Sequence, residues 1–506
     1  IVCSVLVIFL TLWTLWIRVL PLLNLGSIDI LNIVGSDDPL YNLRQTELVL
    51  NNYPAYGWFE ALTLYPTGQI IPWGPMFIWL TSTMCLIAGA STRTEIIQVA
   101  LWLPPILAAL MVPATFLVTR KIWDWKTGLL SAVFIAVIGG QFFFRSLAGY
   151  LDHHIAEVFF STIFIIAYIY AMSVGRKNAI DFKNPGTLKM PAIFAGIAGI
   201  TYVLGFLTMP TMILFAFIAA LATICIFIID FYHGETSEYL VLLNTVTFGI
   251  ATLVALVMGI GNEGFGLYLY NISHPVAYLF LIIGTGILYW LTTYLKGKKW
   301  IYFAASIVGL GLIAAMGVYF LLPGLYSTFI NGLTTFFGFN PYAVTVQEAR
   351  PWTIAEAWAV FNFGILLMIG GVLVLLYKNL KEYRPEHILV LVWSFFIIIA
   401  AFRQVRYEYY LAVNIAVLGG FCVGYFLERA WPDIVGLGRR VTVKEPKEEA
   451  PPELKEEKVK ETGKEKGKGK GTGKEKGKGK EASKKKAVKA PAKAPARPKV
   501  NYAIIL

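Results

Sequence analysis

Uninterrupted apolar runs recur along most of this chain. Two of them, 129–144 and 301–322, contain no Asp, Glu, Lys or Arg. Runs of about 18 or more apolar residues match the roughly 30 Å hydrocarbon core of a bilayer. A helix pairs its own backbone donors and acceptors, as lipid requires, and the strict two-residue alternation of a membrane β-barrel is absent. The sequence, which is 57% hydrophobic, therefore predicts an all-α polytopic membrane protein.

We expect about twelve membrane-spanning helices and the start of a thirteenth. The spans are predicted at 1–23, 96–119, 127–147, 153–175, 190–207, 209–230, 239–259, 276–295, 300–321, 357–377, 387–402 and 407–428. The chain begins inside an apolar run without Met, and its last residues turn apolar again. We therefore expect both ends to lie within helices.

The apolar segment 73–90 is assigned by charge, because cytoplasmic loops of membrane proteins are rich in Lys and Arg. If this segment is a re-entrant or interfacial helix on the outer side, every basic loop falls inside the cell. These loops contain Arg120, Lys121 and Lys126; Arg176, Lys177, Lys183 and Lys189; Lys296, Lys298 and Lys299; and Lys378, Lys381 and Arg384. The segments 24–76, 148–152 and 323–356 then share the extracytoplasmic side, where one site could form.

Most of the net charge of +12 is concentrated in a Lys-rich tract at 444–499. Its Lys, Glu, Gly, Ala and Pro residues cannot bury enough apolar surface to offset ordering entropy, so we expect disorder. A cytoplasmic tract of this kind is attracted to anionic membrane lipids. It lacks the interleaved aromatic residues that stack on bases, so we expect no nucleic-acid partner. The predicted parts are a transmembrane domain at 1–428, this disordered cytoplasmic loop at 429–500, and the start of a last transmembrane helix at 501–506.

Asp37 and Asp38 lie just beyond the first predicted span. Ionisable groups beside lipid are costly and tend to be functional. An Asp-Pro turn that opens a surface loop explains the pair equally well. The residues alone leave both interpretations open.

Asp152, His153 and His154 occupy the shortest outer turn, seven residues after Arg145. Carboxylate oxygen and imidazole nitrogen are ligands for Mn²⁺ or Mg²⁺. Three such side chains in one membrane turn favour a metal site over the alternative, a polar cap on the next helix.

Two further polar groups lie at outer ends of spans. Glu356 closes the segment Thr353-Ile354-Ala355-Glu356 and, taken alone, is best explained as a complement to the following helix N-terminus. Arg403 and Arg406 are unusual on this side and favour a clamp on a lipid phosphate, because guanidinium pairs bidentately with phosphate oxygens. The alternative is that both arginines extend toward the interface.

These motifs together resemble the catalytic subunit of oligosaccharyltransferases. The resemblance rests on Asp38-Pro39 with Tyr41 and Arg44; Trp73-Gly74-Pro75; Arg145 followed by Gly149-Tyr150-Leu151-Asp152-His153-His154; Thr353-Ile354-Ala355-Glu356; and Arg406-Tyr407. The Asp-His-His and Thr-Ile-x-Glu forms are similar to those of archaeal members. The match covers most of 1–428.

The resemblance implies a membrane-embedded glycosyltransferase helical bundle of the GT-C type. Such an enzyme transfers an oligosaccharide from a dolichyl phosphate or diphosphate donor to Asn in Asn-x-Ser/Thr acceptor sequences, with inversion. The archaeal form implies a single-subunit, multi-pass enzyme of the cell membrane whose site faces outward.

The same resemblance implies site residues. Asp38, Asp152 and His154 would hold Mn²⁺ or Mg²⁺, and Asp38 and Glu356 would engage the acceptor amide. Arg145 would support the catalytic site. Arg406, with His153 and Arg403, would bind the donor phosphate.

One departure and two alternatives accompany this prediction. Family members carry a Trp-Trp-Asp-Tyr-Gly motif in an external domain that reads the acceptor Ser or Thr, and this sequence lacks it. We expect that domain to follow the helix that begins near 502. Another lipid-donor enzyme, such as a protein O-mannosyltransferase, would share outward acidic loops, and a transporter would show inverted repeats with broken midplane helices.

Overall fold

The computed structural model describes residues 2–23, 37–259, 262, 266–337 and 346–442. The chain divides into two units, Ile1–Tyr425 and Phe426–Leu506. The predicted disordered loop spans 429–500, but its first residues, 429–442, are helical and belong to α19 (Glu408–Thr442). The rest of that loop, from 443 onward, and the predicted last helix at 501–506 lie outside the described residues and stay predictions.

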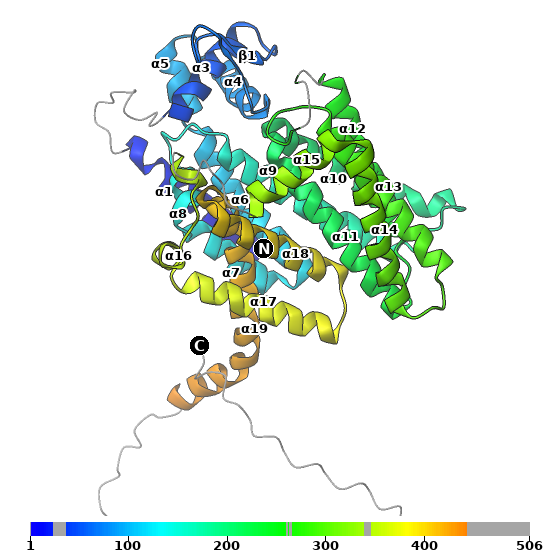
Figure 1. Cartoon of the computed structure of the whole chain (residues 1–506). Coiled ribbons are helices and arrows are strands. Elements are labelled where there is room, and N and C mark those ends of the chain that lie inside the picture. The colour runs from blue at the N-terminus through cyan, green and yellow to red at the C-terminus, as the bar shows by residue number, and fades with distance from the viewer. Residues whose placement is uncertain (1, 24–36, 260–261, 263–265, 338–345, 443–506) are drawn as a thin grey trace, which may run out of the picture. The chain divides into compact units, whose positions relative to one another are not determined.

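The described residues are almost entirely helical (Figure 1). The longer helices are α1 (Val2–Leu23), α3 (Asp37–Asn51), α4 (Met76–Ala88), α6 (Leu103–Ile122), α7 (Trp125–Val137), α9 (His154–Lys177), α10 (Pro185–Thr208), α11 (Ile213–His233), α12 (Glu238–Val257), α13 (Ser273–Tyr294), α14 (Trp300–Leu321), α15 (Pro323–Phe337), α17 (Phe363–Lys381), α18 (Pro385–Arg403) and α19 (Glu408–Thr442). Shorter elements are α5 (Arg93–Ala100), α8 (Gly140–Phe144), α16 (Ile354–Phe361), the 3₁₀ turns η1 (Pro210–Met212), η3 (Gln347–Ala349) and η4 (Val405–Tyr407), and the strand pair β1 (Phe59–Glu60) and β2 (Gln69–Ile70).

The prediction of an all-helical, multi-pass membrane protein is confirmed. Among the described residues, 11 helices are long and apolar enough to cross a membrane, and each coincides with a predicted span. The twelfth predicted span, 127–147, is not one continuous helix: it consists of the 13-residue α7 and the five-residue α8. The segment predicted to be re-entrant or interfacial contains α4, a 13-residue apolar helix.

Two of the predicted spans are each divided into two helices, and a residue with a positive φ lies at each division. Gly140 has a φ of +74°, which a side chain would disfavour, and it is the first residue of α8, after the break that follows Val137 of α7. Asn362 has a φ of +45° and divides the predicted span 357–377 into α16 and α17. Its ψ of −127° lies outside the left-handed helical region, in a conformation that a residue with a Cβ rarely adopts. Apolar periodicity carries no signal for either break.

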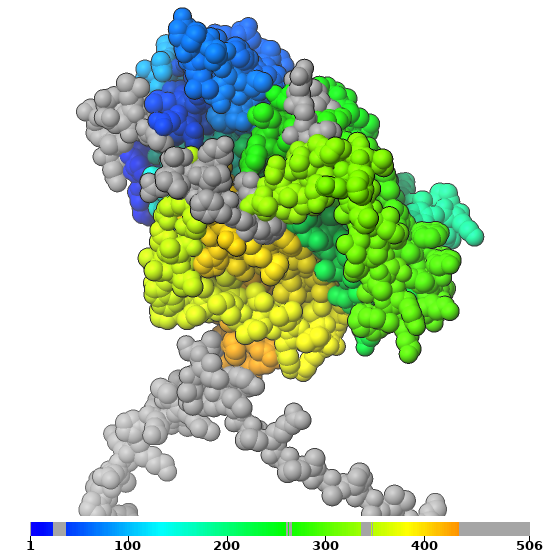
Figure 2. All heavy atoms as spheres, in the orientation of Figure 1, coloured from blue at the N-terminus to red at the C-terminus, as the bar shows by residue number. Residues whose placement is uncertain are grey.

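Helix α9 lies at the centre of the first unit and packs against α6, α10, α12 and α18. Two-thirds of its most apolar 18-residue window, 67%, is buried, compared with 6% for α14. Figure 2 shows α14, in green, on the surface of this unit. Because its exposed side chains are apolar, α14 suits contact with lipid. Helix α9 is instead surrounded by other helices, so side chains at its ends are held in fixed positions.

Helices α3, α4 and α5 pack together near the N-terminal end of α9 (Figure 1). Gly74 lies where this outer group meets α10: its N–H donates to the carbonyl of Thr208 at 3.0 Å. An added Cβ would come within 2.0 Å of the Leu207 carbonyl oxygen, so only glycine allows this approach. The outer group is thereby fixed against the membrane bundle.

Candidate active site

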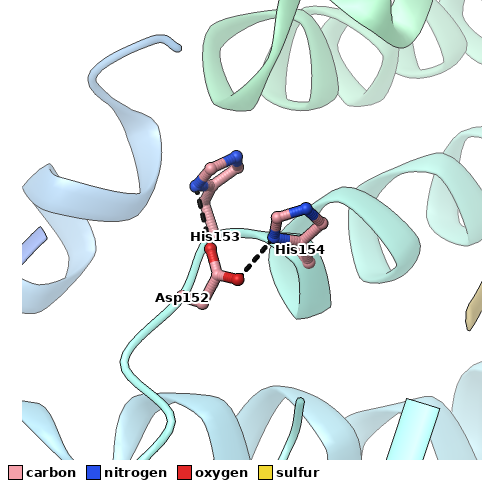
Figure 3. Close-up of side chains that lie close together, drawn as sticks. All are labelled: Asp152, His153 and His154. Atoms are coloured by element: carbon pink, nitrogen blue, oxygen red, sulfur yellow. Dashed lines mark ion pairs between the residues drawn. The ribbon is translucent and has the colours of Figure 1, made fainter. Parts of the chain in front are cut away.

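The turn that precedes α9 brings Asp152, His153 and His154 together (Figure 3). One ligand atom from each lies within 4.8 Å of the others. The two carboxylate oxygens of Asp152 are divided between the histidines: Oδ1 is 3.1 Å from His153 Nδ1, and Oδ2 is 2.6 Å from His154 Nδ1. All three side chains are buried or nearly so. The three side chains lie close together, as the sequence predicts.

The backbone of this turn depends on Gly149 and on helix α1. Gly149 has a φ of +107°, which reverses the chain before Asp152. The Ala148 N–H donates to the Arg18 carbonyl at 2.9 Å, and Arg18 Nε donates to Ser146 Oγ at 2.8 Å. Arg18 is fully buried in α1. These bonds tie the first membrane helix to the turn that carries the polar cluster.

Helix α3 presents Asp38 to the same turn. Asn42 Nδ2 donates to the Leu151 carbonyl at 3.2 Å. An aromatic series adds a second connection: the Tyr41 ring meets Trp73 edge-on at 5.1 Å, and Trp73 stacks on His153 at 5.0 Å. Favourable aromatic contacts of this kind stabilise a pair by about 1 kcal/mol beyond their burial. Asp38 is thus held beside the histidine turn by its helix neighbours.

The pKa of Asp38 is raised, first by burial and then by the negative charge of Asp152. Glu348 raises it further, whereas the two histidines oppose the shift. Asp152 behaves differently: its burial favours the neutral acid, but His154 and His153 outweigh this and hold its pKa well below the usual range. Two carboxyl groups in one site therefore have different protonation preferences.

Glu348, in η3, connects the cluster to two arginines. Its Oε2 accepts from Arg145 Nη2 at 2.7 Å, and its Oε1 accepts from Arg406 Nη2 at 2.7 Å. Arg145 also donates to Asp152 Oδ2 at 3.3 Å. Burial raises the pKa of Glu348, but Arg406, His154 and Arg145 together lower it below the ordinary value. Charges from three distant segments therefore meet around Asp152.

The structure does not bring Glu356 into this cluster. Thr353 and Glu356 form a capping box at the start of α16, in which each side chain accepts a backbone N–H. Glu356 is also paired with Arg350 at 2.7 Å and is partly exposed. The predicted helix-terminus contact of Glu356 is present in the structure, and its catalytic role stays a prediction.

Glu348 was not among the residues singled out from the sequence. Thr-x-x-Glu before an apolar run is a capping signature, which accounts for Glu356 locally. Eight residues earlier, Glu348 matches no such local motif. Its partners Arg145 and Arg406 lie 203 and 58 positions away in the chain, so sequence spacing carries no signal for these contacts.

Of the three predicted phosphate-binding residues, Arg406 and His153 lie at the cluster and Arg403 does not. Arg406 lies at the cluster through Glu348, and its Nε has no acceptor among the described residues. His153 Nε2 lies 3.3 Å from Glu157 Oε1, so its polar contacts are with Asp152 and Glu157. Arg403 is exposed at the end of α18 and has no ion pair within the described part of the chain.

The donor set at the turn fits a divalent cation. Asp152 Oδ1, His153 Nδ1 and His154 Nδ1 are buried atoms without an aligned hydrogen-bond partner among the described residues. Buried polar atoms are normally satisfied, and each exception needs an explanation. A cation between an oxygen and imidazole nitrogens supplies one.

The model of the family "Oligosaccharyl transferase STT3, N-terminal" matches residues 26–429. The chain belongs to the STT3 oligosaccharyl transferase family. The matched range contains α3, the histidine turn, Glu348 and both arginines. The predicted family resemblance is therefore confirmed.

Curated archaeal relatives agree with this membership. The chain is 27% identical over 424 residues to dolichyl-phosphooligosaccharide-protein glycotransferase 3 of Archaeoglobus fulgidus, covering 78% of this chain and 47% of the relative. It is 23% identical over 488 residues to dolichyl-monophosphooligosaccharide–protein glycotransferase AglB of Haloferax volcanii, covering 80% and 46%. The chain thus spans about half the length of these relatives.

Solved structures show the same fold. The archaeal oligosaccharyltransferase AglB from A. fulgidus, in complex with an inhibitory peptide and a dolichol-phosphate, superposes with a TM-score of 0.78 at 22% identity. The alignment covers 88% of this chain and 52% of that one. A structure of the A. fulgidus enzyme with Zn and sulfate gives a TM-score of 0.64 at 21% identity over 86% and 51% of the two chains.

Proposed function

We propose that the protein transfers an oligosaccharide from a dolichyl phosphate-type donor to the Asn side chain of Asn-x-Ser/Thr acceptors. Family membership supports the reaction class. The observation that carries the assignment is the buried Asp152–His154 pair, joined through Arg145 to the Glu348 carboxylate. Such a cluster combines cation ligands, a further carboxylate and guanidinium groups, which suit the charge that develops in transfer from a lipid phosphate.

The proposed metal ligands are Asp38, Asp152 and His154, with His153 close enough to contribute. Mn²⁺ or Mg²⁺ fits the hard oxygen donors. Bound there, the ion supplies charge neutralisation for the departing phosphate. The A. fulgidus structure with Zn and sulfate supports a cation site in a protein of this fold.

Asp38 and Glu356 stay our candidates for the carboxylates that contact the acceptor amide, and Glu348 is a further candidate for this contact because it lies in the same charged cluster as Asp152. An amide nitrogen is a poor nucleophile because its lone pair is delocalised into the carbonyl. Carboxylates that accept its N–H hydrogen bonds weaken this conjugation and fix the nitrogen behind the anomeric carbon. A backside approach of this kind inverts the sugar configuration. The low pKa of Glu348 keeps it an acceptor.

Arg406 is our candidate for the donor-phosphate contact. One of its terminal nitrogens is used by Glu348, which leaves its Nε and other N–H groups as donors. Charge-assisted hydrogen bonds from guanidinium to phosphate are among the strongest in proteins. Glu348 thereby orients Arg406, and the same carboxylate accepts from Arg145. The exposed Arg403 would approach the donor only at its periphery.

The proposed site lies on the extracytoplasmic side of the cell membrane. All the basic loops between spans then face the cytoplasm, as the positive-inside trend requires. The proposed partners are a lipid-linked oligosaccharide, an acceptor polypeptide and membrane lipids, with no additional subunit needed. A cysteine-accessibility measurement on intact cells tests the side: Ser91→Cys, in the outer group, should react with a membrane-impermeant maleimide, whereas Lys298→Cys should not.

The transfer reaction is tested with protein purified from its own membranes, a lipid extract and a peptide containing Asn-x-Thr. We expect a glycan-sized mass increase on the peptide, lost in EDTA and restored by Mn²⁺ or Mg²⁺. The matched control peptide carries Gln in place of Asn and should stay unmodified. A glycan on Ser or Thr of that control would instead identify an O-linked transferase.

A further inference from the structure

A polar cavity of about 540 Å³ lies at the opposite end of α9 from the histidine turn. It is lined by Lys121, Ile122, Ser173, Arg176, Lys177, Glu382, Tyr383, Arg384 and Glu386. These residues come from the C-terminal ends of α6 and α9 and from the connection between α17 and α18. Because α9 has 24 residues, the cavity and His154 are separated by about 36 Å along its axis. The cavity is therefore distinct from the candidate active site.

The wall around Arg176 is held by a buried carboxylate. Asp230, only 1% exposed, accepts hydrogen bonds from Tyr383 at 2.7 Å and Ser237 at 2.7 Å. Arg176 lies over the Tyr383 ring at 5.4 Å and is paired with Glu235. The tyrosine and the arginine are thus fixed in place without a ligand.

The cavity carries more positive than negative charge. Four cations line it, against two carboxylates. Arg176 is neutralised by Glu235, and Arg384 by Glu382. Lys121 and Lys177 have no carboxylate within 4.0 Å in the described part of the chain, although Glu386 shares the cavity. Two lysines are therefore available to an anion.

Lys121 is oriented for such a contact. Its Nζ donates to the buried Ser173 Oγ at 2.7 Å and lies 4.9 Å from the centre of the Tyr170 ring. An ammonium group has three donors, so two remain for a ligand. The contacts hold the charge at the cavity rather than letting it extend into solvent.

We propose that this cavity binds a phosphate group, presented either by an anionic phospholipid headgroup or by a soluble phosphate compound. Lys121 and Lys177 supply the charge, and Ser173 adds a hydroxyl donor, whereas the Tyr383 hydroxyl is already used by Asp230. The cavity lies at an end of the membrane-spanning helices, among the loops whose Lys and Arg content predicts the cytoplasmic side. Basic pockets between membrane helices on that side suit phosphorylated headgroups.

Native mass spectrometry of the full chain in detergent tests the proposal, with dioleoyl-phosphatidylglycerol, dioleoyl-phosphatidylcholine and inorganic phosphate as separate probes. We expect phosphatidylglycerol to be retained more strongly than phosphatidylcholine. The double variant Lys121→Gln/Lys177→Gln should weaken retention roughly thirtyfold, since each basic residue near a membrane surface contributes about 1 kcal/mol. The single variant Lys177→Gln, at an exposed position, should weaken it about fivefold without affecting the fold.

The matched control is Lys296→Gln/Lys298→Gln, which removes the same charge from an exposed loop outside the cavity. It should retain phosphatidylglycerol within twofold of the unchanged protein. Equal loss in both double variants, or equal retention of the two lipids together with no binding of inorganic phosphate, would overturn the proposal. Tight binding of inorganic phosphate that depends on Lys121 and Lys177 would support the site and assign it to a soluble ligand.

Discussion

Glu348 Oε2 lies 2.7 Å from Arg145 Nη2, although the two residues are 203 positions apart in the chain. The other oxygen of the same carboxylate accepts from Arg406. One acid from η3 therefore joins the histidine turn, through Arg145, to the beginning of the last described membrane segment. Removing that acid should disturb both the acceptor and the donor side of the proposed site.

Replacing Glu348 by Gln should lower peptide glycosylation by roughly a hundredfold or more, the scale expected when a transition-state contact is lost. The matched variant Glu95→Gln removes the same charge from the capping box at the start of α5 and should keep activity within about threefold, with a small loss of stability from the weakened cap. Mass spectrometry of the peptide gives the rate of glycosylation, and thermal unfolding in detergent gives the stability, so the two measurements separate a loss of activity from a loss of stability. Equal activity losses would contradict the assignment of Glu348.

Replacing His154 by Ala should weaken Mn²⁺ binding by about a hundredfold or more, because losing a proposed ligand costs at least as much as losing a group that only orients one, about tenfold to a hundredfold. Calorimetric titration of the metal-free protein measures this without relying on turnover. His274→Ala is the control, because His274 is a buried histidine in α13, outside the cluster. Unchanged Mn²⁺ affinity in His154→Ala would remove that residue from the ligand set.

Metal affinity should fall as the pH decreases, beginning above the range where an ordinary Asp titrates, about 3.9. The pKa of Asp38 is raised by burial and by Asp152, so its carboxylate takes up a proton at a higher pH than usual. The protonated acid binds metal poorly. Asp38→Asn should lose this part of the pH dependence, as measured by Mn²⁺ titrations at several pH values. An identical profile in the variant would show that Asp38 is not a ligand.

Gly140→Ala should destabilise the protein by about 1–2 kcal/mol, the cost of a left-handed conformation for a residue with a Cβ. The added carbon would also lie 2.2 Å from Glu408 Oε1, which accepts from the Gln141 N–H. Activity should fall as well, because α8 leads directly to Arg145. Gly249→Ala, in α12 with nothing within 4 Å, should leave the unfolding temperature unchanged or slightly higher. Similar temperatures for both variants would contradict this account.

Apolar run length was sufficient to predict the membrane helices, because the bilayer imposes one minimum length on all of them. It could not predict the breaks at Gly140 and Asn362, which depend on single backbone angles. The cluster at Asp152 was predictable because its members are adjacent in sequence. The Arg145–Glu348–Arg406 connection was not, since it forms only when three distant segments are packed.

Glu356 shows a different limit. The Thr-x-x-Glu pattern predicts a helix cap from the sequence alone, and the structure contains this capping box at the start of α16. The catalytic role that the motif resemblance implies for Glu356 stays a prediction, because a capping contact and a contact with an acceptor do not exclude each other.

The central claim is tested most directly by peptide glycosylation with protein purified from its own membranes, comparing the unchanged protein with Glu348→Gln in the presence of Mn²⁺. The account predicts a glycan-sized mass increase on the Asn of the acceptor peptide, and its near-complete loss in the variant while Mn²⁺ binding persists. No mass increase with the unchanged protein, or full transfer by Glu348→Gln, would contradict it.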